Sequence, residues 1–139
     1  MRKSILVALF LSLMFASGLT FGDEHGKAHD KNAGKEEGYY KTFIIEVEHS
    51  ADSDGEVVVT IDPYEEEEII VTIPIEDGTR ENKIANTIEE TLKDELDGIY
   101  YVERDDFEKV IIRQDNDSPR FKVAVSNNVN GLALELRGR

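Results

Sequence analysis

The amino-acid sequence predicts an α+β protein, with a mostly antiparallel sheet of about six to seven strands and one amphipathic helix packed on one face. Two observations predict this class. Seven segments alternate apolar and polar residues with a period of two, which is typical of half-buried strands. One segment repeats apolar residues at spacings of three and four, which is typical of a helix with one buried face. The order is three strands, the helix and four strands.

The first three strands are predicted in the segments TFIIEVE, EVVVTI and EEIIVTIPI. Their apolar positions alternate and are rich in β-branched residues. These positions are Phe43, Ile45, Val47, Val57, Val59, Ile61, Ile69, Val71, Ile73 and Ile75. The segment HSADSDG is expected to form a turn in which Gly55 takes a positive φ, and DPYEEE leads to the third strand. An antiparallel meander is the simplest arrangement of the three.

The helix is predicted between Thr79 and Gly98 and is expected to run for about 17 residues. We expect Thr79 as its N-cap, Glu81 in the first turn, where the helix dipole favours an acid, and Gly98 as the C′ residue. Its apolar stripe consists of Ile84, Ala85, Ile88, Leu92 and Leu96. This stripe is expected to pack on the inward faces of the strands.

The last four strands are predicted in the segments IYYVE, FEKVIIRQ, RFKVAVS and LALELR. The segments ERDD and DNDSP between them have the composition of turns. Asn130-Gly131 is a strong turn dipeptide, so we expect it to close a hairpin between the last two strands.

Residues 1–22 have the features of an export signal peptide. Two basic residues come first, the apolar run Ile5–Phe15 follows, and small residues end the segment. Cleavage is expected after Gly22 or, alternatively, after Gly18. Because the apolar run is too short to span a bilayer, we expect an exported protein that is periplasmic or extracellular. Once the signal is removed, we expect no membrane insertion.

The chain after the signal divides into two parts. Residues 23–38 contain Gly, Lys, Asp, Glu and His and almost no aliphatic side chains, so we expect a disordered, acidic, histidine-containing tail. Residues 39–139 are expected to form a single α+β domain. No cysteine occurs, which excludes both a disulfide framework and a lipidated cysteine anchor.

The chain is strongly acidic, and this limits its partners. Its net charge is −14, and removing residues 1–22 also removes Arg2 and Lys3, so the charge becomes −16. Nucleic acids and anionic membrane surfaces bind through Lys and Arg side chains. We therefore expect no nucleic-acid partner, whereas a protein or polysaccharide partner of unknown identity stays open.

The amino-terminal histidines suggest a metal site. If cleavage follows Gly22, the chain begins Asp23-Glu24-His25. A terminal amine, two backbone nitrogens and an imidazole then offer four nitrogens in a plane, which Cu²⁺ and Ni²⁺ prefer. This start resembles the amino-terminal copper- and nickel-binding motif, and His29 could add a ligand. Cleavage after Gly18 removes the site.

A second oxygen-rich segment is Asp115-Asn116-Asp117. Carboxylate and amide oxygens are the ligands of Ca²⁺, so a loose calcium loop is one interpretation. A turn held by local side-chain hydrogen bonds is the other.

The sequence predicts no enzyme. His49 is the only histidine after the tail, and its neighbour Ser50 would point to the opposite face of a strand. Nucleophilic catalysis needs a base within hydrogen-bond reach of the nucleophile. With 30 acidic residues, no single pair of carboxylates stands out as catalytic.

We therefore expect an exported, non-catalytic binding or assembly module of the cell envelope or extracellular space. Self-association through strand edges is one form of this, with the tail before Tyr39 donating a strand to a neighbouring copy. The alternative is a copper- or nickel-binding envelope protein that uses the Asp23-Glu24-His25 start. The strand–helix–strand order with Asp77-Gly78-Thr79 at the helix start, over roughly residues 55–136, also resembles small modules of phage tails and of exported bacterial proteins. This resemblance implies a phage-tail-like or surface structural module as a second alternative.

Overall fold

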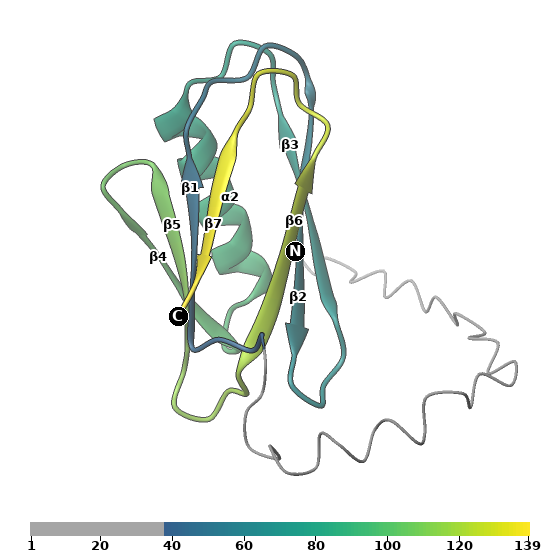
Figure 1. Cartoon of the computed structure of the whole chain (residues 1–139), viewed down its shortest axis with the longest axis vertical. Helices are drawn as coiled ribbons and strands as arrows, with labels where there is room; N and C mark the ends of the chain where they lie inside the picture. Colours follow the sequence, from purple (N-terminus) through teal and green to yellow (C-terminus); the bar gives the residue numbers. More distant parts are fainter. Residues whose placement is uncertain (1–37) are drawn as a thin grey trace, which may run out of the picture. The chain divides into compact units, whose positions relative to one another are not determined.

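A computed structural model describes residues 38–139 and confirms the α+β class, with seven strands in two antiparallel sheets and one helix (Figure 1). Before the helix come β1 (Thr42–Val47), β2 (Gly55–Pro63) and β3 (Ile69–Ile75). The helix α2 spans Glu81–Glu95. After it come β4 (Tyr100–Asp105), β5 (Lys109–Gln114), β6 (Phe121–Asn127) and β7 (Leu134–Gly138).

The strands divide unequally between the two sheets. The first sheet has the order β4-β5-β1-β7 and the second has the order β3-β2-β6. β1 therefore lies between β5 and the carboxyl-terminal strand β7, and β2 lies between β3 and β6. Every pairing is antiparallel.

The helix α2 contacts both sheets. It packs on β1, β4 and β5 of the four-stranded sheet and on β3 of the other sheet. Figure 1 shows it behind β1 and β7, between the two groups of strands. The helix therefore lies mainly against the terminal strands β3 and β4 and not against the other terminal strands, β6 and β7.

One hydrophobic core joins the helix and the inward strand faces. The helical stripe is fully buried, as the 3.6-residue period requires. On the strands, the alternating apolar set is buried while the residues between point outward. Among residues 38–139 no polar or charged residue is fully buried. The largest fully buried side chain is Phe121, and its ring centroid lies 4.6 Å from that of Tyr100.

Tyr40 links the two sheets just before β1. Its backbone N–H donates to the Phe121 oxygen at 2.8 Å, and the Phe121 N–H donates back at 3.1 Å. The Tyr40 ring packs on Phe43 and on the backbone of Gly138 in β7. One residue thus contacts β6 of one sheet and β1 and β7 of the other.

Two expected strand connections are wrong. β1 does not continue into a meander with β2 and β3; only the β2–β3 pairing of that expectation is present. β6 and β7 are not paired with each other either, so Asn130-Gly131 turns the chain from one sheet to the other instead of closing a hairpin. In both cases the loop crosses between sheets, which alternation along the strands does not reveal.

Three local expectations also differ from the structure. Arg80, not Thr79, is the N-cap of α2, because the Thr79 hydroxyl donates to the Glu76 carbonyl at 2.7 Å instead. Gly98 has the expected positive φ of 75°, but it lies two residues after the C-cap Leu96. Gly55 begins β2 without a positive φ, and its missing side chain makes room for Asn128 and Val129.

Candidate functional site

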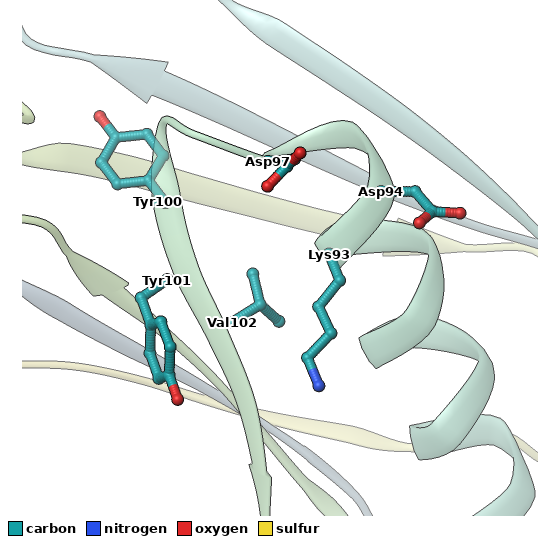
Figure 2. A pocket seen from close by; sticks show the side chains of 6 residues that line it. All are labelled: Lys93, Asp94, Asp97, Tyr100, Tyr101 and Val102. Carbon is teal, nitrogen blue, oxygen red and sulfur yellow. The ribbon is translucent and has the colours of Figure 1, made fainter.

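A hollow of about 440 Å³ lies between the end of α2 and β4 (Figure 2). Its lining residues are Lys93, Asp94, Asp97, Tyr100, Tyr101 and Val102. In Figure 2 the Tyr101 ring lies on the far side of the β4 ribbon from Lys93 and Asp94, so these groups do not converge on one point. Tyr101 is 58% exposed, and it offers an aromatic face at the rim.

Two ionisable groups that line this hollow, Tyr100 and Lys93, have partners within the fold. The Tyr100 hydroxyl donates to the Pro119 carbonyl at 3.0 Å. Burial, followed by the charges of Glu66 and Asp62, raises the pKa of Tyr100 to about 12, so the hydroxyl stays protonated at neutral pH. The Lys93 amine lies 2.6 Å from a Glu89 oxygen, and this hydrogen bond raises the pKa of Lys93.

A second hollow, of about 270 Å³, lies on the outer face of the four-stranded sheet. It is lined by Thr42, Ile44, Asp105, Lys109, Ile111, Arg113, Arg137 and Arg139. Four cationic side chains thus surround two isoleucines, a combination that sequence analysis did not find. Only the period-two pattern of FEKVIIRQ, which puts Lys109, Ile111 and Arg113 on one face, could have indicated part of it.

An aromatic cluster lies beside the start of β6. The rings of Tyr39 and Tyr64 meet edge to face with centroids 5.2 Å apart, and the Lys122 amine lies 4.2 Å from the Tyr39 ring centroid. The Tyr39 hydroxyl donates to Asp62 at 3.4 Å. This cluster holds the chain beside β6 immediately before β1 begins.

The free edge of β6 is the least protected of the four sheet edges. Its sequence, FKVAVSN, has one charged residue, whereas β4 has three, β7 has two and β3 contains Pro74. Natural edge strands discourage further pairing with charges, prolines or covering elements. Lys122, Ala124 and Ser126 face outward, and Val123 and Val125 are half-buried.

The backbone of β6 alternates between two directions. The Phe121 N–H and C=O point to Tyr40, away from β2, whereas the Arg120 carbonyl accepts a bond from the β2 side, from Tyr64. Because these groups alternate along an antiparallel strand, those of Val123 and Val125 also point away from β2. Among residues 38–139 only Tyr40 pairs with this side of β6, so within that part of the chain these groups are open to another extended segment.

The candidate copper or nickel ligands Asp23, His25 and His29 lie outside the described residues, so that site stays a prediction. Asp115, Asn116 and Asp117 form a turn in which the Asp115 carboxylate accepts the Asn116 N–H at 2.7 Å and its carbonyl accepts the Ser118 N–H at 3.1 Å. In residues 38–139 no three His, Cys, Asp or Glu side chains are grouped so that they could hold a metal ion. The turn interpretation agrees with this geometry.

His49 and Ser50 lie in the loop after β1, near the start of α2. His49 is exposed, and Ser50 hydrogen-bonds to the Glu81 carboxylate. The pKa of Glu81 is lowered, first by its backbone N–H, then by Ser50, and further by the charges of His49 and Arg80. The serine therefore supports the first turn of the helix.

No family model matches the chain, and no curated protein or solved structure matches it. In the part of the chain that the structure describes, no helix has both the length and the apolar character needed to cross a membrane.

We predict that the secreted protein begins at Asp23 and binds one Cu²⁺ through its first three residues. A free amine with histidine in third place should give the absorption spectrum of a square-planar nitrogen complex. Mass spectrometry of the secreted chain checks the terminus, and a copper titration checks the site. His25→Ala should abolish the spectrum, whereas His49→Ala should leave it unchanged. A chain that starts at Leu19 would contradict the prediction.

Proposed function

We propose that this protein is an exported, non-catalytic binding and assembly module, and that copies associate by strand addition at β6. The observation that carries the proposal is the free edge of β6, where backbone groups point outward and only Lys122 is charged. Strand addition obtains its affinity from main-chain hydrogen bonds, so it needs neither a deep pocket nor catalytic groups.

The geometry of Tyr40 supports this mode of binding. Its paired hydrogen bonds with Phe121 already extend the three-stranded sheet by one residue on the β6 side. An added strand would therefore begin at Val123 and continue towards Asn127. A second β6 strand can pair there antiparallel about a two-fold axis at Val125, which gives a closed dimer with one continuous sheet.

We expect the secreted chain to dimerise as its concentration rises. The substitution Ala124→Lys should raise the dissociation constant of the dimer by at least about tenfold. Ala124 is exposed on the outer face of β6, and in a two-fold pairing about Val125 each added lysine would lie opposite Ser126 of the other copy and diagonally across from the second lysine. Light scattering over a concentration series measures the association. Thr72→Lys is the matched control, because Thr72 is also exposed and outward-facing, but on the edge strand β3.

A wild-type chain that stays monomeric at all concentrations would contradict self-association, as would equal weakening by Thr72→Lys. A deletion of residues 23–38 separates the two possible donors of the added strand. If β6 pairs with β6, the dimer survives the deletion. If the tail before Tyr39 donates the strand, the dimer is lost.

A further inference from the structure

The hollow on the outer face of the four-stranded sheet has the composition of a ligand site. Its volume is about 270 Å³, close to the lower end of small-molecule sites. The strand register places Ile44 beside Ile111 on β5 and beside Arg137 on β7. Ile111 is only 7% exposed although it points out of the sheet, so the longer side chains around it cover it.

The lining of this hollow is mostly cationic, although the protein as a whole is strongly acidic. Residues 1–37 contain five basic and five acidic residues, so the net charge of −14 belongs to residues 38–139. That part has eleven Lys and Arg side chains, and four of them line this one hollow, with Asp105 as the only acid. The fraction of Lys and Arg among the lining residues is therefore far higher than their fraction in residues 38–139 as a whole.

Neighbouring carboxylates hold two of the cations, Arg113 and Arg137, in place. An Arg113 Nη lies 2.5 Å from Glu103, and Arg137 contacts Glu135 at 2.7 Å and Glu46 at 3.1 Å. These acids are outside the lining of the hollow. A guanidinium has five N–H donors, and these contacts use one donor of Arg113 and two of Arg137, so donors remain for a ligand. Holding the side chains in advance lowers the entropy cost of binding.

Arg139 is anchored differently. Its backbone N–H donates to Thr42, and its backbone oxygen accepts from Lys41 and Thr42, so the main chain is fixed at the rim. Its guanidinium lines the hollow and, within the described residues, makes no ion pair with an acidic side chain.

We propose that this hollow binds a small hydroxy-carboxylate. The planar carboxylate matches the forked donors of Arg113, Arg137 and Arg139, and Ile44 and Ile111 provide an apolar floor. Asp105 accepts a hydrogen bond from a hydroxyl group of the ligand. A small anion fits better than an acidic polymer, because the net negative charge of the protein repels polyanions at long range.

The test is a titration of the secreted chain with glucuronate at constant ionic strength, followed by calorimetry. We expect saturable binding with a Kd on the order of 1 mM, no binding of glucose, and weaker binding of inorganic sulfate. Arg139→Gln should weaken glucuronate binding about tenfold without leaving an unpaired acid, and Arg113→Gln should weaken it by a similar factor although it also removes the ion-pair partner of Glu103. Lys83→Gln, which removes an equal charge from the exposed face of α2, should leave the Kd unchanged.

Absence of saturable glucuronate binding would overturn the proposal. Equal binding of sulfate would also overturn it, because the site would then be a general anion site. If polygalacturonate bound more tightly per residue than glucuronate, the ligand would be an acidic polysaccharide and not a free small acid. Equal loss in Lys83→Gln would show that net charge, not the hollow, controls binding. Circular dichroism of each variant confirms that it is folded.

Discussion

Phe121→Ala is expected to lower the free energy of unfolding by about 3–5 kcal/mol, the range for removing a large buried aromatic side chain. Phe121 is fully buried at the start of β6, its ring packs on Tyr100, and its backbone pairs with Tyr40. The truncation leaves a cavity where β6 meets Tyr100 of β4 and Tyr40, the residue just before β1. For a domain of this size such a loss lowers the Tm by at least about 12 °C.

Urea denaturation followed by circular dichroism measures this change. The control is Phe107→Ala, because Phe107 is 76% exposed in the turn between β4 and β5 and should change the stability by less than about 0.5 kcal/mol. A loss at Phe121 as small as the one at Phe107 would mean that the core does not contain this ring.

Gly138→Ala is expected to lower the free energy of unfolding by about 1–3 kcal/mol, the cost of overpacking a filled site. A Cβ atom on Gly138 would overlap three ring atoms of Tyr40. The ring cannot move aside freely, since Tyr40 is bonded through its backbone to Phe121 and packs on Phe43. The strain therefore acts on the residue that joins the two sheets.

A double-mutant cycle identifies the cause. In a Tyr40→Ala background there is no ring to overlap, so Gly138→Ala should cost almost nothing. Thermal unfolding of the wild type, the two single variants and the double variant gives the coupling energy between Tyr40 and Gly138. If Gly138→Ala costs the same in both backgrounds, its effect comes from the β7 backbone and not from Tyr40.

The order and type of the elements could be predicted from the sequence, because both depend on local patterns. The set from Phe43 to Val47 alternates, and the set from Ile84 to Leu96 follows the helical period, whatever lies next to them. The division into two sheets could not be predicted. β1 pairs with residues 109–113 and 134–138, and a period-two pattern shows which face is buried but not which strand is the neighbour.

The candidate sites show the same limit. Asp115 to Asp117 were recognisable as a turn because their hydrogen bonds are local. The hollow around Ile44 was not recognisable, because its cations come from β5 and β7 and meet only through long-range pairing. The sequence did not show that β6 lies at an edge of its sheet either, because this depends on which strands pair with β6.

The position of β1 determines when the chain can fold. β1 is complete at Val47, yet one neighbour ends at Gln114 and the other at Gly138, one residue before the end of the sequence. During synthesis from the amino terminus, β1 therefore has no strand partner until β5 has emerged, and its second partner, β7, emerges later still. Non-local pairing of this kind is slow, since distant segments must first meet. The β2–β3 hairpin and α2 can form from local contacts before this, whereas the four-stranded sheet is completed only when β7 joins β1.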